Sequence, residues 1–389
     1  MRPLVVSHTG VTGGSTQGIL GLLRNRPADV DPVCAFLDDG PAARAVRDLG
    51  VEAHVLNAGR ARELWRVPAV VARLARLMRS HHVDVVFSHA SKAQVYAAPA
   101  AAIARVPNLW HQYEVPGLER SAPGMTRVLQ ELAGRLPTRM VLCGSEFVAR
   151  RHAARWPGAP VRRVYPGVRA DGVAPREHTA ASDVRIVVTG RLQRWKRVDR
   201  ALDAMPRLLE AVPGARLRIV GAGRPDVDAD YPAELRARAA ALGITGAVEF
   251  AGEPADVDAQ LAGADILVHP ADREGFGLAV AEALLRGIPA VVAPLGGPTE
   301  IVRDGVDGLI VDPEDAPALA GALVRLARDP GTRSEMGRAG RARVLELFDE
   351  GRAAAETWRL VAEATARPRA RRSHTAVGKP ASRAYVGGE

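Results

Sequence analysis

The sequence has few cysteines, few aromatic residues and no long apolar run. Its two cysteines, Cys34 and Cys143, lie in strand-like segments and give neither a disulfide framework nor a Cys/His spacing typical of zinc. The longest apolar runs, such as AAPAAAIA, are far below the roughly 20 residues that a membrane-spanning helix needs. The start, MRPLVVSHTG, has too short an apolar segment for a signal peptide. We therefore expect a protein of the reducing cytoplasm.

Lysine is also rare, because arginine supplies 50 of the 53 basic residues and lysine occurs only at positions 92, 196 and 379. The net charge of +9 is divided unevenly along the chain. Residues 1–170 carry 23 basic and 12 acidic side chains, whereas residues 171–366 carry 24 and 31. Either the first half contacts something anionic, or the composition simply drifts along the chain.

A chain of 389 residues with 47% apolar residues suits two domains. Short strand-like runs alternate with helical patterns in both halves, which is typical of parallel sheets covered by helices on both faces. We predict an α/β fold with two similar doubly wound domains, residues 1–170 and 184–366, the second ending in a closing helix. The polar segment 171–183 is the predicted linker, and the Pro- and Arg-rich tail, 367–389, is predicted to be disordered.

Two carboxylates stand out in the second half, between the strand-like runs ADILVHP and PAVVAP. Glu274 lies on a turn with Gly275 and Gly277, where it can accept hydrogen bonds from a sugar, and the amides of Phe276–Leu278 can approach a ligand closely. Glu282 lies in the following apolar helix, where a carboxylate must find donors or titrate. The hydroxyls of a ribose would satisfy it, and a salt bridge to the nearby Arg286 is the structural alternative.

A second loop, in GRLQRWKRVDRAL, follows the strand-like run VRIVVTG. Arg191 and Lys196 are placed by this loop at the mouth of the same crevice, because parallel strands end at one edge of a sheet. Two fixed cations can bind both phosphates of a nucleoside diphosphate and stabilise the charge that grows on a departing phosphate. A lysine at this position of an arginine-rich chain indicates that the site needs a compact ammonium. The structural alternative is a solvated loop cation.

The combination of GRLQRWK, VEFAGE and ADILVHPADREGFGLAVAEALLRGIPAVVAPLGGPTEIVRDGVDGLIVDP resembles the retaining glycosyltransferases of family 4. The resemblance covers most of the second half and implies two facing Rossmann-like domains of the GT-B type with an interdomain cleft. It implies a nucleotide-sugar donor, for which we favour UDP over GDP, and retention at the anomeric carbon without a metal or other cofactor. It assigns Arg191 and Lys196 to the diphosphate, Glu274 to the donor sugar and Glu282 to the ribose.

The first half matches the family more thinly. Gly13 and Gly14, in HTGVTGGSTQG, resemble the glycine loop that lies against the donor phosphate and the acceptor, although such a pair suits any tight turn. His111, in NLWHQYE, matches the histidine that reaches the donor sugar from the opposite domain, and its position at a strand end favours this role over a structural one. These matches complete the predicted catalytic group, His111, Arg191, Lys196 and Glu274.

The segment DVDAD at 226–230 has the acid-x-acid spacing that holds a divalent metal in another glycosyltransferase fold. It precedes Tyr231 and Pro232 and a helical pattern, so helix capping is the favoured interpretation. We therefore predict no metal in the site.

The acceptor is less well defined by the sequence. Residues 61–82 combine apolar positions with five arginines, with Arg60 just before them, and resemble a basic amphipathic helix that can lie on an anionic membrane surface. The resemblance adds that many related enzymes act on lipid-linked acceptors from the cytoplasmic face, so we favour a hydroxyl on a lipid-linked glycan or polysaccharide of the cell envelope. An ordinary covering helix with snorkelling arginines is nearly as well supported, and it would favour a soluble acceptor such as an aminocyclitol. No nucleic-acid partner is predicted.

Two other function classes share this architecture. A sugar-nucleotide 2-epimerase would need further titratable groups in the cleft, which the sequence does not identify. A catalytically silent binding subunit would be easier to support if Arg191, Lys196, Glu274 or Glu282 were missing, and all four are present.

Overall fold

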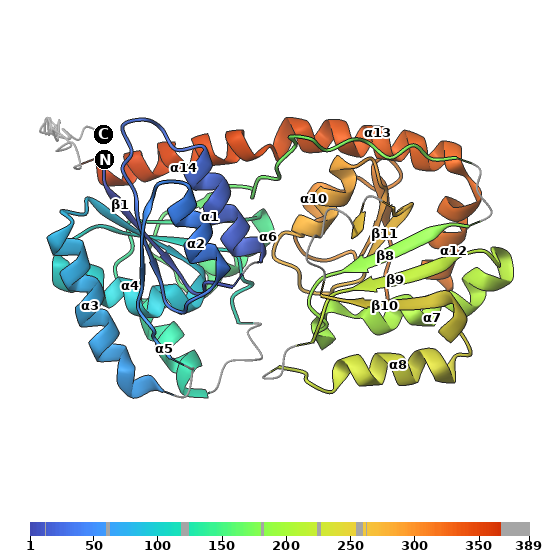
Figure 1. Cartoon of the computed structure of the whole chain (residues 1–389), viewed down its shortest axis with the longest axis horizontal. Helices are drawn as coiled ribbons and strands as arrows, with labels where there is room; N and C mark the ends of the chain where they lie inside the picture. Colours follow the sequence, from blue (N-terminus) through green and yellow to red (C-terminus); the bar gives the residue numbers. More distant parts are fainter. Residues whose placement is uncertain are drawn as a thin grey trace, which may run out of the picture.

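The computed structural model describes residues 1–11, 13–59, 63–117, 124–179, 183–223, 227–253, 260–261 and 263–366. The predicted disordered tail, 367–389, and part of the predicted linker, 180–182, lie outside the described residues. The chain forms two α/β domains that lie side by side, each built on a parallel sheet (Figure 1). This is the α/β architecture that the alternating sequence pattern predicts.

The first sheet has seven strands in the order β3-β2-β1-β4-β5-β6-β7, and all neighbours are parallel. Its strands are β1 (Pro3–Ser7), β2 (Val33–Phe36), β3 (Glu52–Val55), β4 (Val85–His89), β5 (Asn108–Gln112), β6 (Met140–Cys143) and β7 (Val161–Arg163). The helices are α1 (Gly14–Arg24), α2 (Pro41–Asp48), α3 (Val67–Ser80), α4 (Ala90–Ala104), α5 (Gly124–Gly134) and α6 (Glu146–Arg155), with the short 3-10 helix η1 (Leu64–Arg66) before α3.

Both faces of this sheet are buried, as continuous apolar strands of parallel sheets require. Successive residues of β1 alternate between two cores, because side chains point to opposite faces along a strand. Leu4 and Val6 pack with residues of α3 and α4, whereas Val5 packs with residues of α1 and α2.

The second sheet has six strands in the order β10-β9-β8-β11-β12-β13. Its strands are β8 (Arg185–Thr189), β9 (Arg216–Val220), β10 (Val248–Gly252), β11 (Ile266–His269), β12 (Ala290–Val292) and β13 (Gly308–Ile310). The helices are α7 (Val198–Ala211), α8 (Tyr231–Ala241), α10 (Leu278–Leu285), α11 (Pro298–Ile301), α12 (Ala316–Arg328) and α13 (Pro330–Leu347), with the 3-10 helices η2 (Arg194–Lys196) and η3 (Thr245–Ala247).

The last helix, α14 (Glu350–Thr365), returns to the first domain, and α13 and α14 run along one side of both domains (Figure 1). Trp358 is buried, and its indole nitrogen donates a hydrogen bond of 3.0 Å to the carbonyl of Leu22 in α1. It packs in one cluster with Phe87 and Leu109 of the first sheet. The prediction that the closing helix belongs to the second domain is therefore wrong, because α14 packs on the first sheet. An amphipathic pattern shows that a helix needs a partner surface, but it does not show which sheet supplies that surface.

The segment predicted as a linker is held along the second domain where it is described. The backbone nitrogen of Arg176 donates to the carbonyl of Arg286 at 2.6 Å, and the Arg176 guanidinium pairs with Asp265 at 2.9 Å. The chain instead passes between the domains near Val168, which forms a bridge with Asp349 at the start of α14. The two backbone crossings between the domains therefore lie side by side.

The segment predicted as a basic amphipathic helix, 61–82, contains α3, which begins at Val67. Its residues 61 and 62 lie outside the described part of the chain. Val70, Leu74 and Met78 are buried in the core of the first domain, so α3 is a covering helix of the sheet with exposed arginines on its outer side. Among the described residues, no helix has both the length and the apolar character to cross a membrane.

The packing of α14 leads to a test of its role. Trp358→Ala removes the buried indole through which α14 packs on the first sheet. We expect this change to lower the free energy of unfolding by about 3–5 kcal/mol. Urea denaturation followed by circular dichroism measures this change. Trp65→Ala is the matched control, because the Trp65 side chain is 74% exposed. Equal stability of the two variants would show that α14 does not hold the first domain.

Candidate functional site

Two loops meet at the carboxyl edge of the second sheet, because β8 and β11 are neighbours in it. The first loop leaves β8 at Gly190, whose φ of +135° is available to glycine at little cost, and continues through η2 to α7. The second loop leaves β11 and reaches α10 through Gly277, with φ +102°. Strand order reverses between β8 and β11, and this is where open α/β sheets bind their ligands.

The two loops bring Lys196 and Glu274 together. The Lys196 ammonium forms an ion pair and hydrogen bond with Oε2 of Glu274, and the two side chains are only 16% and 17% exposed. The ammonium also lies 4.3 Å from the centre of the Trp195 ring. The imidazole Nε2 of His269, at the end of β11, lies 3.3 Å from the same carboxylate oxygen. The sequence prediction that Lys196 and Glu274 share one crevice is consistent with this arrangement.

Electrostatics keep this carboxylate ionised. Burial alone would raise the pKa of Glu274, but Lys196 and His269 hold that pKa well below its usual value. Burial lowers the pKa of His269, although the Glu274 carboxylate partly opposes this effect. A buried carboxylate, an ammonium and a neutral imidazole therefore lie within reach of one ligand. The ammonium suits a phosphate oxygen and the carboxylate suits sugar hydroxyls.

The glycine segments predicted from the sequence face each other across the domain interface. A β-carbon on Gly14, at the start of α1, would lie 2.8 Å from Cδ1 of Leu278, the first residue of α10. A β-carbon on Gly275 would lie 2.1 Å from the carbonyl oxygen of Tyr113, so only glycine fits there. Gly13 has no neighbouring atom within 4 Å of such a β-carbon, which leaves open space beside the turn.

Polar contacts join the domains beside these glycines. The Ser145 hydroxyl donates to the carbonyl of Gly275 at 2.5 Å. The Glu300 carboxylate, in α11, accepts 2.9 Å hydrogen bonds from the backbone nitrogens of Glu146 and Phe147 at the start of α6. A carboxylate at a helix N-terminus is favourable because free amides and the helix dipole converge there. Sequence reasoning missed Ser145 and Glu300, since no local pattern indicates a contact between domains.

Arg191 is exposed, and its charge contributes to the lowered pKa of His8 in the first domain. Burial lowers the pKa of His8, the Lys92 and Arg191 cations lower it further, and Glu114 opposes them. Lys92 is paired with Asp38 at 2.7 Å. The pKa of His8 therefore responds to charges from both domains.

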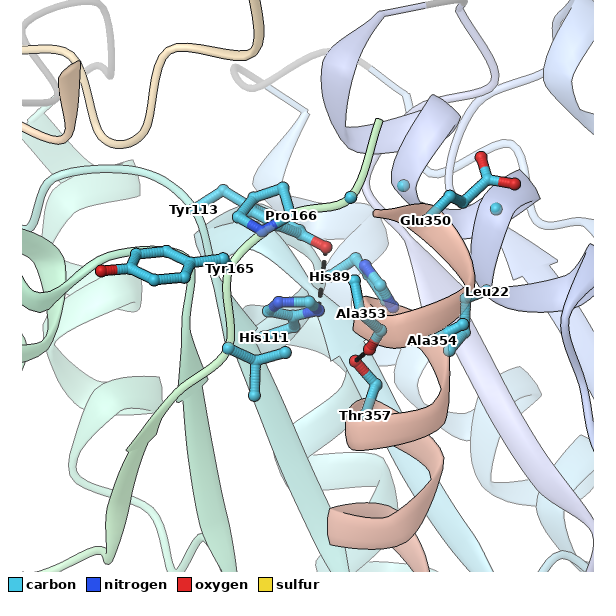
Figure 2. Close-up of a pocket in the computed structure, with 14 residues that line it drawn as sticks. Leu22, His89, His111, Tyr113, Tyr165, Pro166, Glu350, Ala353, Ala354 and Thr357 are labelled. Atoms are coloured by element: carbon cyan, nitrogen blue, oxygen red, sulfur yellow. Dashed lines mark hydrogen bonds between the residues drawn. The ribbon is translucent and has the colours of Figure 1, made fainter. Parts of the chain in front are cut away.

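The structure does not place His111 in contact with the Lys196–Glu274 pair. Its ring is buried and stacks on Phe87. Its Nδ1 forms a 2.9 Å hydrogen bond with the Tyr113 hydroxyl. Burial lowers the pKa of His111 to about 3. Figure 2 shows the ring beside His89 in a small cavity between the first sheet, the segment at Tyr165 and α14. The assignment of His111 to the donor sugar stays a prediction, since a strand-end position does not determine which way the side chain points.

The remaining predicted residues lie along the second loop and α10. Phe276 is buried with its ring 5.4 Å from that of Phe348, so its backbone, not its side chain, is left for a ligand. Glu282 is half-buried in α10, and Arg286 donates a 2.9 Å hydrogen bond to its backbone carbonyl. The assignment of Glu282 to a ribose stays a prediction.

Two family models match the chain. Residues 13–171 match the model "Glycosyltransferase Family 4", and residues 175–343 match "Glycosyl transferases group 1". The model boundaries fall where the chain crosses between the domains.

Individual relatives agree with these matches. The chain is 31% identical over 296 residues to a GDP-mannose-dependent alpha-(1-6)-phosphatidylinositol monomannoside mannosyltransferase of Mycolicibacterium smegmatis, covering 70% of this chain and 75% of that protein. It is 40% identical over 157 residues to a D-inositol 3-phosphate glycosyltransferase of Acidothermus cellulolyticus, covering 39% of this chain and 35% of that protein.

Solved structures of other proteins have the same fold as this chain. HepE of Anabaena, crystallised with UDP-glucose, superposes with a TM-score of 0.81 at 20% identity, covering 93% of this chain and all of that one. At this identity the likeness concerns the fold, which consists of two facing Rossmann-like domains of the GT-B type. Together with the family matches and the mannosyltransferase relative, it shows that this chain is a glycosyltransferase and belongs to glycosyltransferase family 4.

Proposed function

We propose that the protein transfers a hexosyl unit from a nucleoside diphosphate sugar to a hydroxyl of a cell-envelope acceptor, with retention at the anomeric carbon and without a metal. The observation that carries this proposal is the Lys196–Glu274 pair, which lies at the strand-order reversal of the second sheet and next to the glycine contacts between the domains. A nucleotide sugar offers both an anion for the ammonium and hydroxyls for the carboxylate.

In the proposed reaction, the bond between the anomeric carbon and the phosphate oxygen breaks, and its electron pair leaves with the nucleoside diphosphate. The acceptor oxygen bonds to the same carbon, and the proton of the acceptor hydroxyl passes to an oxygen of the departing phosphate. Lys196 and Arg191 stabilise the charge that grows on the departing phosphate. Glu274, ionised at neutral pH, orients the sugar through its hydroxyls.

The names of the relatives bear on which nucleotide carries the donor sugar. The sequence alone favours UDP, but the mannosyltransferase relatives that share about 70% of this chain are named as GDP-mannose-dependent. The solved structures with UDP are at most 21% identical and support only the fold. We therefore place GDP-mannose first and UDP-glucose second as the donors to test.

An acceptor that contains a phosphorylated cyclitol fits the names of both groups of relatives. One group acts on phosphatidylinositol monomannoside, a lipid, and the other on D-inositol 3-phosphate, a small molecule. We place the lipid-linked acceptor first, because the lipid-named relatives cover more of this chain. Exposed arginines on α3, such as Arg73 and Arg76, support peripheral contact with an anionic membrane by charge alone. The soluble acceptor is the second candidate.

A transfer assay tests this function. Purified protein is incubated with GDP-mannose or UDP-glucose, and with a phosphatidylinositol glycolipid or inositol phosphate as acceptor. We expect transfer with one of the donors, release of the nucleoside diphosphate only when acceptor is present, and the same anomeric configuration in donor and product by NMR. Conversion of the donor sugar without acceptor would instead indicate a 2-epimerase, and no turnover with any pair would contradict the proposal.

Metal dependence gives a second test. Because Lys196 and Arg191 carry the positive charge that a divalent metal supplies in other phosphate sites, we expect the transfer rate to be unchanged after treatment with excess EDTA. The rate is measured before and after addition of Mg²⁺ or Mn²⁺. Activity that disappears with EDTA and returns with either metal would contradict the metal-free site.

A further inference from the structure

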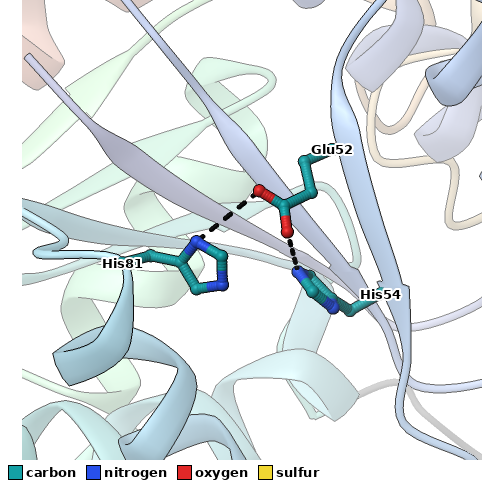
Figure 3. A group of neighbouring side chains, drawn as sticks. All are labelled: Glu52, His54 and His81. Atoms are coloured by element: carbon teal, nitrogen blue, oxygen red, sulfur yellow. Dashed lines mark ion pairs between the residues drawn. The ribbon is translucent and has the colours of Figure 1, made fainter.

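A second group of polar side chains lies in the first domain, on β3 and at the end of α3. Glu52 and His54 belong to β3, which is an edge strand of the first sheet. Because residues two apart on a strand point to the same face, these two side chains project together. His81, which directly follows α3, reaches the same point (Figure 3). Figure 1 places α3 on the side of the first domain away from the second domain, so this group is separate from the cleft.

The three side chains converge on a small volume. Nε2 of His54 lies 2.9 Å from Oε1 of Glu52, and Nδ1 of His81 lies 3.5 Å from Oε2. One ligand atom from each residue lies within 4.8 Å of the other two. The contact of His54 with Glu52 does not have hydrogen-bond geometry, and its Nε2 is buried without a hydrogen-bond partner in the described part of the chain. This buried nitrogen is therefore available as a ligand.

The spacing suits one tetrahedral metal ion. Zinc binds histidine nitrogen at about 2.0–2.1 Å and carboxylate oxygen at about 2.0–2.2 Å, so two of its ligands lie roughly 3.3–3.5 Å apart. The two imidazole nitrogens lie 2.9 and 3.5 Å from different oxygens of Glu52, and one ligand atom from each residue lies within 4.8 Å of the other two. A small shift of the side chains would therefore bring all three to one zinc ion. The side chain of Glu52 is 48% exposed, so it can adjust its position and leave water access to a fourth ligand position.

We propose that Glu52, His54 and His81 bind a single zinc ion, which ties the edge strand β3 to the end of α3. Two imidazoles and one carboxylate form a ligand set that suits zinc and related transition metals. Arg73, Arg76 and Arg79 line an adjacent groove together with His54. The two imidazole ligands favour nitrogen-binding metals over Mg²⁺ and Ca²⁺, which prefer oxygen ligands.

Isothermal titration of the full-length, untagged protein with ZnCl₂ tests the site. We expect one zinc ion per chain to bind the wild type, and binding to His54→Ala and His81→Ala to be at least about tenfold weaker, since each loses one of three protein ligands. MgCl₂ is expected to give no binding. His82→Ala is the matched control, because His82 is exposed, adjacent to the group and not part of it. Its zinc affinity is expected to equal that of the wild type.

Thermal unfolding provides an independent readout. Zinc that binds only the folded protein should raise the melting temperature of the wild type and of His82→Ala, but not that of His81→Ala. If a histidine variant does not fold, Glu52→Gln at the exposed edge strand tests the same loss of affinity. Absence of zinc binding by the wild type would contradict the proposal. Zinc binding that survives all three substitutions in the group would also contradict it.

Discussion

The buried ion pair between Lys196 and Glu274 is the interaction on which the rest of the cleft depends. Taking two charges out of water is costly, and their mutual attraction offsets that cost only while both remain in place. The pair exists because β8 and β11 are neighbours, so the loops that follow them lie side by side. A ligand that separates the two charges must replace both partners. A sugar bonded to a diphosphate can do so, with its phosphate on Lys196 and its hydroxyls on Glu274.

The arrangement of the two domains determines what else can reach this pair. Ser145 and Glu300 join the domains beside Gly275, and the close approach of Gly14 to Leu278 brings the glycine turn of the first domain to α10. The return of α14 to the first sheet connects the domains a second time. The second domain therefore supplies the charged pair, and the backbone of the first domain at Tyr113 packs against Gly275, which follows Glu274.

Much of the fold could be predicted from the sequence, because alternating strands and helices leave few topologies for a parallel sheet. The Lys196 and Glu274 loops were also predictable, since both follow strands that end at one edge and lysine is rare. The orientation of His111 was not predictable, because a residue at a strand end can face either side of the sheet. The destination of α14 and the grouping of Glu52 with His81 depend on contacts between distant parts of the chain, which local patterns do not encode.

The central claim is that the donor's diphosphate binds Lys196 and its sugar binds Glu274, and calorimetric binding of variants tests it most directly. Lys196→Gln is expected to weaken binding of both the free nucleoside diphosphate and the nucleotide sugar by about 10- to 100-fold. Glu274→Gln should weaken only the nucleotide sugar. Arg194→Gln is the control, because Arg194 pairs with Glu234 of α8 instead of Glu274. Unchanged affinity of folded Lys196→Gln for both ligands would contradict the account.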